Sequence, residues 1–366
     1  MFLAMHMANE LLSVPVAAAT LLVGGAAVAL AARRAGRTLD PERFPLMGVM
    51  GAFVFAAQMI NFTLPGMPGT SGHLGGGVLL AIVLGPAAAI VTMAGILIVQ
   101  CLMFQDGGLL ALGCNIINMG IVPCLLGFGV YRLMLGQADK AKAWRQYLAA
   151  WGACIVVLPV GAALAPVEAG FSGVLRIPVG HFLAVMVGVH LLIGLVEGTI
   201  TFAVIAYLRR VRPSLVSAPQ AAEKESLGRA PVIVSLIVTA LLLAGVVSWF
   251  ASTHPDGLEW SYTEHSYGQT GGSVENSSPT ISTVDRWQSK WTLMTDYSRR
   301  PATLGQKPAA ENNAGGDNSS EPWPNASGWT SLAGLVGTVL TLVIIYVIAR
   351  LVRPGQVVGP ISRQEH

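Results

Sequence analysis

Eight apolar segments dominate the sequence, and most are long enough for a helix to cross a lipid bilayer. They lie at about residues 11–32, 46–64, 74–104, 113–134, 147–166, 179–207, 231–250 and 329–350. Hydrophobic residues make up 53% of the chain and charged residues 11%, which excludes an ordinary soluble globular composition. Because a helix satisfies its own backbone hydrogen bonds in lipid, the sequence predicts an all-α polytopic membrane helical bundle.

The third segment is longer than one crossing requires, and the pair Gly85-Pro86 interrupts it. Proline clashes with the preceding helical turn, so we expect two short helices there, at 75–84 and 87–104. The first would be only about 15 Å long at 1.5 Å per residue. It cannot span the membrane alone, so other helices must shield it.

The basic residues indicate how these helices are oriented. With the third segment split, most of the 22 lysine and arginine residues fall on one side of the membrane. In the short loops on the other side, Arg176 is the only basic residue. Because cytoplasmic loops carry the excess of Lys and Arg, we expect nine helices, with the N-terminus outside and the C-terminus inside.

A polar linker divides the chain into two parts. Residues 1–208 contain seven predicted helices, and residues 209–230 form a cytoplasmic linker. Residues 231–350 contain two helices that enclose the polar segment 251–328, and residues 351–366 form a cytoplasmic tail. Segment 251–328 is rich in Ser, Thr, Gly and Asn and poor in aliphatic residues, so we expect a weakly structured extracytoplasmic loop.

Two histidines are predicted at the outer face: His6, directly after Met5, and His73 in the uncharged loop Ser71-Gly72-His73. A lone loop histidine is usually only a polar surface residue, but two beside a chain end could hold a metal ion. If the mature chain began at Met5, its amine, the next amide nitrogen and the His6 imidazole would form fused chelate rings, with His73 as a fourth nitrogen. Such a planar set suits Ni(II) or Cu(II), fits tetrahedral Zn(II) poorly and excludes Ca(II) and Mg(II).

The four residues before Met5 bear directly on this site. With them present, Met5 has a peptide nitrogen in place of an amine, and one ligand is lost. Either Met5 is the true start, or the extension is removed, or the site is built differently.

Several polar residues lie within apolar segments, where they are functional candidates because unpaired polar groups are costly in lipid. They are Gln100, Asn115, Asn118, His190 and Glu197. Asn115 and Asn118 share a helical face, as His190 and Glu197 nearly do. The alternative is that these groups form hydrogen bonds between helices. For His190 and Glu197 we favour a structural or supporting role.

Other patterns mainly narrow the function. Segment Thr253-His254-Pro255-Asp256-Gly257-Leu258-Glu259 is typical of a turn just outside the membrane, and it could contribute oxygen or imidazole ligands. The four cysteines lie in apolar segments without a CxxC pair, which indicates buried small side chains. The sequence has no GxxxxGK[ST], HExxH or GxSxG motif and no basic–aromatic patch, so we expect no ATP hydrolysis, no hydrolase chemistry and no nucleic-acid binding.

Four motifs in order resemble the NikM/CbiM family, the substrate-capture components of energy-coupling-factor nickel and cobalt importers. They are MetHisMet at 5–7, SerGlyHisLeuGlyGlyGlyValLeuLeuAlaIleValLeuGlyPro at 71–86, GlnAspGlyGlyLeuLeuAlaLeuGlyCysAsnIleIleAsnMetGly at 105–120, and HisLeuLeuIleGlyLeuValGluGlyThrIleThr at 190–201. ProAspGlyLeuGlu at 255–259 resembles the small NikN/CbiN-like component, here fused over residues 231–350.

The resemblance implies a seven-helix capture unit that holds Ni(II) or Co(II) near the outer face, followed by two C-terminal transmembrane helices. Its metal ligands would be the Met5 amine, His6 and His73, with Met5 as the start of the mature chain. The supporting residues would be Ser71, Gly72, Gln100, Asn115, Asn118, His190 and Glu197. In the fused part, Pro255, Asp256, Gly257, Leu258 and Glu259 form the motif.

The resemblance also implies partners and a location. The chain would work with a coupling transmembrane subunit and two cytoplasmic ATPase subunits, in the lipid of a bacterial cytoplasmic (inner) membrane. We therefore expect the metal-binding component of a nickel importer, without ATP or enzymatic activity on this chain. The alternatives are a cobalt importer component for cobalamin synthesis, a membrane metal sensor without transport, and an intramembrane enzyme, for which His190 and Glu197 are the only candidate pair.

Overall fold

The computed structural model describes residues 6–40, 43–67, 69–136, 142–216, 229–262, 274, 276, 278–297 and 328–352. The α-helices and strands are α1 (Val14–Thr38), α2 (Phe44–Gln58), β1 (Phe62–Thr63), β2 (Ser71–Gly72), α3 (Gly77–Leu84), α4 (Pro86–Val99), α5 (Leu112–Asn115), α6 (Phe128–Leu135), α7 (Ala143–Ser172), α8 (Val179–Val211), α9 (Arg229–Gly245), α10 (Gly257–Tyr262), α12 (Pro279–Trp291) and α13 (Gly328–Val352). Short 3-10 helices are η1 (Asn9–Leu11), η6 (Pro213–Leu215), η8 (Val247–Phe250) and η9 (Thr295–Tyr297), and π-helical segments are η3 (Gln100–Phe104), η4 (Ile116–Ile121) and η5 (Pro123–Gly127).

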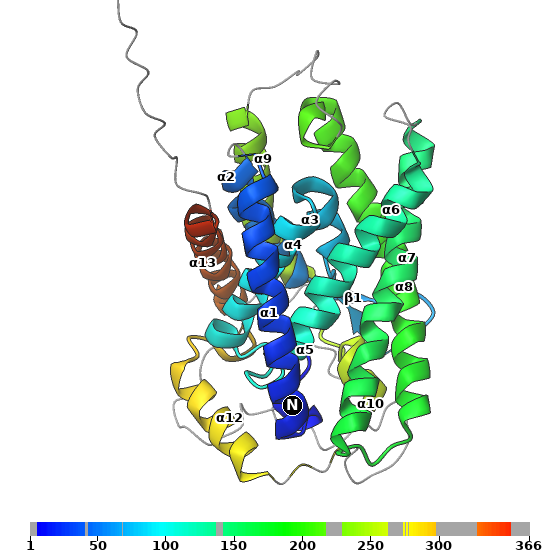
Figure 1. The fold of residues 1–366 in the computed structure, drawn as a ribbon, viewed down its shortest axis with the longest axis vertical. Helices are drawn as coiled ribbons and strands as arrows, with labels where there is room; N and C mark the ends of the chain where they lie inside the picture. The colour runs from blue at the N-terminus through cyan, green and yellow to red at the C-terminus, as the bar shows by residue number, and fades with distance from the viewer. Residues whose placement is uncertain are drawn as a thin grey trace, which may run out of the picture.

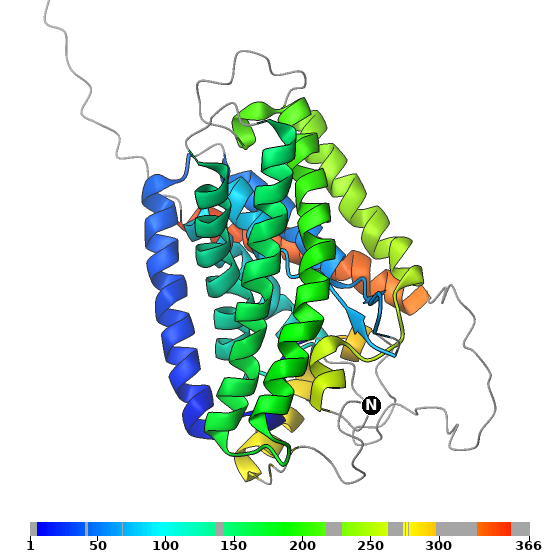
Figure 2. The ribbon, with the colours of Figure 1, turned by 90° about the vertical axis from the view of Figure 1, so that its right-hand side faces the viewer.

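The long helices form one bundle, with α1 along one side (Figures 1 and 2). Within the described residues, six helical stretches are long and apolar enough to cross a membrane. They are Val14–Thr38, Pro86–Phe104, Leu112–Leu135, Ala143–Ser172, Val179–Val211 and Gly328–Val352. Two further apolar helices, Phe44–Gln58 and Ala230–Gly245, are shorter. The fold is thus that of a polytopic helical membrane protein, while the orientation of its termini stays a prediction.

The third apolar segment is broken where the Gly85-Pro86 pair predicts. Helix α3 ends at Leu84, and α4 begins at Pro86 after Gly85, whose φ of +84° suits glycine. Proline at the first helical position is favourable because its missing amide hydrogen needs no helical partner. All eight residues of α3 are buried, so the short helix is shielded by its neighbours.

The helices on either side of the linker share one hydrophobic core. Helix α2 packs against both α9 and α13, and buried residues of all three belong to the same cluster. A Cβ at Gly48 would lie 3.0 Å from the Leu342 carbonyl oxygen, so this glycine permits the close approach of α13 to α2. The second part of the chain is therefore packed into the bundle of the first.

The expectation of a weakly structured loop at 251–328 is wrong for the parts that the structure describes. Helices α10 and α12 lie at the end of the bundle where α1 begins (Figure 1). Helix α12 is fastened by polar side chains: Gln288 is 2% exposed and donates to the Cys101 and Gly107 carbonyls at 3.0 and 2.9 Å. A polar composition therefore concealed a folded segment. Loop residues 263–273 and 298–327, linker residues 217–228 and tail residues 353–366 lie outside the described part.

Candidate metal centre

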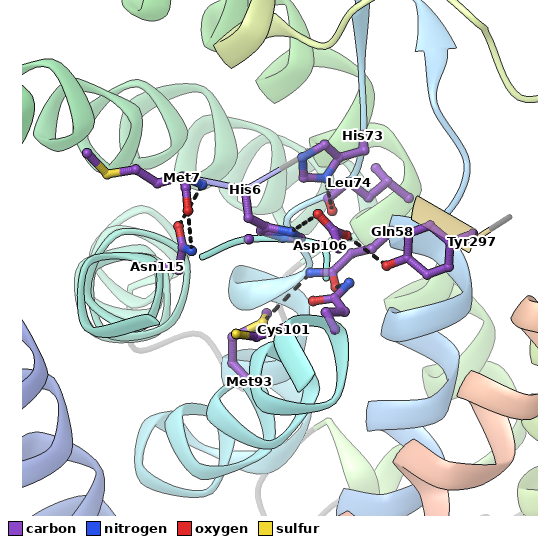
Figure 3. A network of polar contacts seen from close by, with 12 residues as sticks. His6, Met7, Gln58, His73, Leu74, Met93, Cys101, Asp106, Asn115 and Tyr297 are labelled. Carbon is purple, nitrogen blue, oxygen red and sulfur yellow. Dashed lines mark hydrogen bonds and ion pairs between the residues drawn. The ribbon is translucent and has the colours of Figure 1, made fainter. Parts of the chain in front are cut away.

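The structure brings His6 and His73 together at the end of the bundle where α1 begins. Their ring centroids are 5.5 Å apart, and the ring planes are inclined by 56° (Figure 3). His6 is only 2% exposed, whereas His73 is partly buried. Both line a cavity of about 90 Å³. The two imidazoles are therefore close enough to serve one ion.

A buried carboxylate orients the His6 ring. His6 Nδ1 lies 2.7 Å from Asp106 Oδ1, and the Tyr297 hydroxyl donates to Asp106 Oδ2 at 2.7 Å (Figure 3). Because a carboxylate only accepts hydrogen bonds, Nδ1 must carry the hydrogen, and Nε2 is the basic nitrogen. His6 Nε2 is buried and has no hydrogen-bond partner among the described residues.

The electrostatics of Asp106 favour its ionised form. Burial acts to raise the pKa of this carboxyl, but the charge of His6 and the hydrogen bonds from His6 and Tyr297 outweigh burial and lower the pKa below its usual value. Asp106 is the only charged residue between Arg43 and Arg132 in the sequence. That isolation is a sequence signal for Asp106, although no residue spacing pairs it with the histidines.

His73 presents its ring in a similar way. Its Nδ1 lies 3.1 Å from the Leu74 carbonyl oxygen. A carbonyl cannot donate, so Nδ1 carries the hydrogen and Nε2 is the basic nitrogen. In metal sites, histidines commonly use one ring nitrogen for the metal and fix the other with a carboxylate or a backbone carbonyl. His6 and His73 have one such partner each.

The segment that carries His6 is pinned by Asn115. The Asn115 side chain accepts from the Met7 amide at 3.0 Å and donates to the Met7 carbonyl at 3.2 Å (Figure 3). The Gly108 amide also donates to the Met7 carbonyl, at 3.0 Å. Asn115 therefore clamps the residue after His6, while its role in supporting a metal site stays a prediction.

The loop that carries His73 is held from the membrane helices. Glu197 on α8 accepts from the Gly75 and Gly76 amides at 2.6 and 3.0 Å. Gln58 on α2 donates to the Gly75 carbonyl at 2.7 Å and accepts from Gln100 at 3.0 Å. Glu197 and Gln100 therefore support the loop, while Gln58 was missed because its single sequence position shows no periodic partner.

The remaining predicted residues surround the cavity or the loop. Asn118 and His190 line the cavity; Asn118 donates to Glu168 at 2.8 Å, and His190 Nδ1 lies 2.8 Å from the Met186 carbonyl. No motif or spacing in the sequence had indicated Glu168. Ser71 Oγ donates to the His254 carbonyl at 2.8 Å.

Gly72 packs against the rest of the site from β2. A Cβ there would lie 2.6 Å from Ile193 Cγ1, so a larger residue would not fit. The absence of a side chain thus lets the His73 loop approach α8.

The segment Pro255 to Glu259 forms the start of α10 beside this loop. The Ser71 amide donates to the Pro255 carbonyl at 2.9 Å, and the Glu259 amide donates to Asp256 Oδ1 at 2.7 Å. Gly257 packs on Val189, and Leu258 lines the cavity. The predicted turn is therefore a capped helix whose described contacts are structural.

The described residues supply two imidazoles but no complete ligand set. No group of three His, Cys, Asp or Glu residues in the described part is arranged to hold a metal ion. Met5, the predicted amine ligand, lies outside that part. A chelate ring that includes the amide nitrogen of residue 6 closes through Nδ1 of the same residue, and here His6 Nδ1 is bonded to Asp106.

Comparison with known proteins gives two family matches. Residues 6–215 match CbiM, described as "Cobalt uptake substrate-specific transmembrane region". Residues 230–354 match the PDGLE domain.

Individual relatives are named for metal, nickel or cobalt transport. A protein of Haloquadratum walsbyi named for metal transport is 35% identical over 58% of this chain and 93% of its own length. A protein of Archaeoglobus fulgidus named for fused nickel transport is 40% identical over 54% of this chain and 63% of its own length. The cobalt transport protein CbiM of Geobacter sulfurreducens is 29% identical over 67% of this chain and 71% of its own length.

Proposed function

The chain belongs to the CbiM family of substrate-specific transmembrane regions and carries a PDGLE domain, and from this premise we propose that it captures Ni(II) for an ATP-driven importer. We call residues 6–215 the CbiM part and residues 230–354 the PDGLE part. The family makes the chain a membrane component of metal transport. The choice of nickel, the use of ATP and the ligands are the proposal.

The observation that carries the proposal is the convergence of His6 and His73. His73 Nδ1 faces the Leu74 carbonyl, so Nε2 is its basic nitrogen, whereas a chelate of His6 with the amine of residue 5 would use His6 Nδ1, which here bonds Asp106. Imidazole nitrogens suit Ni(II) and Co(II), whereas Mg(II) and Ca(II) require oxygen ligands. We propose these two rings as ligands, with the Met5 amine completing a nitrogen set where Met5 begins the mature chain.

Energy for transport would come from other subunits. The sequence contains no GxxxxGK[ST] phosphate-binding loop. We therefore propose a coupling transmembrane subunit and two cytoplasmic ATPases as partners. We expect the chain to be located in a bacterial cytoplasmic membrane, with the two histidines at the outer face of that membrane. Cobalt import uses the same residues, and a metal sensor would bind without transport.

Calorimetric titration of the purified chain in detergent with Ni(II) and with Co(II) tests the site. We expect His73→Ala to weaken binding at least tenfold, and a chain that begins at Met5 to bind more tightly than the full 366 residues. His254→Ala is the matched control, because His254 is an exposed histidine outside the cavity. Equal affinity of the full chain, the Met5-start chain and His73→Ala would reject the site.

Uptake measurements separate the transport hypotheses. Cells that coexpress the chain with the coupling subunit and ATPases should accumulate nickel, and His73→Ala should abolish this. Accumulation of cobalt in place of nickel would favour the cobalt alternative. Metal binding without accumulation of either ion would favour a sensor. Mass spectrometry of the mature N-terminus would decide whether an amine at Met5 is available.

A further inference from the structure

Helix α12 presents two exposed tryptophans side by side. The Trp287 and Trp291 side chains are 50% and 68% exposed, and their ring centroids lie 6.2 Å apart. Leu293, two residues after the helix ends, is also exposed. A group of large exposed apolar side chains on one surface commonly marks an interaction site. The function proposed above makes no use of this surface.

The other faces of α12 have a different chemistry. Ile281 and Gln288 are its buried residues, and Gln288 bonds backbone carbonyls of the CbiM part. At about 100° per residue, Trp287 lies about 100° to one side of Gln288, and Ser289 lies about 100° to the other side. Helix α12 therefore packs on the protein with one face, which has an aromatic flank on one side and a serine flank on the other.

The exposed charges of α12 are basic. Arg286 and Lys290 are exposed and lie on the face of the helix opposite Gln288. Asp285 is only partly buried, but it accepts a hydrogen bond from Asn9. Tryptophan beside arginine and lysine is typical of helices that lie in a lipid–water interface. There the indole rings enter the boundary of the acyl chains, and the cations meet the phosphates.

The position of α12 in the fold fits such an interface. The helix lies at the end of the bundle where α1 begins (Figure 1). Exposed apolar side chains of the membrane-length helices continue to this end: Val14 at the start of α1 and Phe171 near the end of α7 are exposed. Because such side chains on a membrane helix face lipid, the lipid-facing surface of the bundle reaches the level of α12.

We propose that α12 is an interfacial helix that lies in the headgroup region of the leaflet at this end of the bundle, with Trp287 and Trp291 toward the acyl chains. The serine flank then faces water, and Arg286 and Lys290 meet lipid phosphates. The partner is the lipid surface, because indole rings next to cations match acyl chains next to phosphates. Since Asp285 bonds Asn9, three residues after His6, this contact also steadies the start of the described chain.

The test places a spin label on each flank of α12 in the full chain. Trp287→Cys and Trp291→Cys each carry a nitroxide on the aromatic flank. Ser282→Cys is the matched control, because Ser282 is exposed and lies nine positions before Trp291, about 180° around the helix. The four native cysteines are buried, and the parent chain treated with the same label gives the background.

The measurement compares collisions of each label with two reagents in phosphatidylcholine vesicles. Oxygen concentrates in lipid, whereas chromium oxalate stays in water, and both are followed by electron paramagnetic resonance. We expect the ratio of oxygen to chromium collisions to be severalfold higher at positions 287 and 291 than at 282. Added phosphatidylglycerol should raise the ratio further at 287 and 291, and Arg286→Gln with Lys290→Gln should cancel that rise. Absence of the rise would refute the contact of these cations with phosphates.

Two other outcomes would overturn the inference. Equal ratios at the three positions would mean that the tryptophans face water. Few collisions with either reagent at 287 and 291 would mean that protein covers them, such as a second copy of this chain. If the cysteine variants do not fold, tryptophan emission decides the matter. Lipids brominated in their acyl chains should quench less emission in Trp287→Phe with Trp291→Phe than in the wild type, and unchanged quenching would reject the proposal.

Discussion

The two histidines are carried by segments that are held in different ways. The His73 loop, residues 71–76, is anchored by side chains of the membrane bundle, Glu197 and Gln58. The His6 segment, residues 6–12, is held at the end of the bundle. There Asn276 donates to the Glu10 and Leu12 carbonyls at 3.0 and 2.9 Å, and Asn9 bonds Asp285.

The two histidines that we propose as ligands therefore depend on different anchors. The His73 loop receives a buried carboxylate on two successive amides, an arrangement that moves only if α8 moves. The His6 segment combines contacts with α12 with the burial of Met7, Leu11 and Leu12 in an apolar cluster. We expect perturbations of the Glu197 anchor to act on His73, and perturbations of Asn115 or of α12 to act on His6.

The largest expected loss of stability and nickel affinity comes from weakening the Glu197 anchor of the His73 loop. Glu197→Gln has the same shape but presents an amide group to one of the two backbone amides, so a donor faces a donor. We expect a loss of about 2–3 kcal/mol in the free energy of unfolding, since a buried donor is left without an acceptor. Nickel affinity should fall at least tenfold. Thermal denaturation in detergent and calorimetric titration measure the two effects.

Glu168→Gln provides the control for that substitution. Glu168 is also on a membrane helix, but it accepts from the Asn118 side chain and makes no described bond to the His73 loop. A glutamine can still accept from Asn118, so we expect a smaller loss of stability and nearly unchanged nickel affinity. If Glu168→Gln weakens nickel binding as much as Glu197→Gln does, the loss of affinity in Glu197→Gln does not come from loss of the loop anchor.

A smaller effect is expected on the His6 side from Asn115→Asp. The new carboxylate keeps the acceptor for the Met7 amide but places a second acceptor against the Met7 carbonyl. We expect a loss of about 1–2 kcal/mol in unfolding free energy and a severalfold loss of nickel affinity. Limited proteolysis should show faster cleavage within residues 6–12 than in the wild type.

Asn115→Ser tests whether the added charge explains this result. Serine is too short to bond both groups of Met7, and it adds no charge. Weaker nickel binding in both variants would assign the effect to the clamp on Met7. Weaker binding in Asn115→Asp alone would show that the His6 segment does not need this clamp.

The parts of the structure that could be predicted from sequence were those governed by local chemistry. The length of the apolar segments predicted the membrane helices, and the Gly85-Pro86 pair predicted the break between α3 and α4. The meeting of His6 and His73 followed from placing both at one end of the bundle. These inferences use properties of neighbouring residues, which a single sequence displays.

The buried hydrogen-bond partners near His6 could not be predicted in the same way. Asp106 and Tyr297 are 191 positions apart, and nothing in their spacing pairs them. Helix α12 buries only Ile281 and Gln288 among its described residues, and Gln288 bonds backbone groups of the CbiM part. The composition of segment 251–328 therefore indicated disorder where a polar clamp is formed.

The smallest expected effect concerns the junction between the His73 loop and the PDGLE part. Ser71 bonds the His254 and Pro255 carbonyls, and the next residue, Asp256, caps α10. Burial is the main cause that raises the pKa of Asp256 from 3.8 to about 7. The charges of Glu259 and Asp106 also raise this pKa, whereas the hydrogen bond from the Glu259 amide and the charge of His6 lower it. The folded protein therefore binds this proton more tightly than the unfolded chain.

The sign of the pH dependence follows from that shift. The contribution of Asp256 to stability is fully present below about pH 4 and is lost as pH rises through about 7, so α10 should be held less firmly at pH 8 than at pH 5. Asp256→Asn keeps an acceptor for the Glu259 amide without titrating, so the difference in melting temperature between pH 5 and pH 8 should shrink. Subtracting the variant from the wild type cancels the other titrating groups. An equal difference in both proteins would contradict the assignment to Asp256, whereas a smaller one with unchanged nickel affinity would show that the His73 loop is held mainly from the membrane helices.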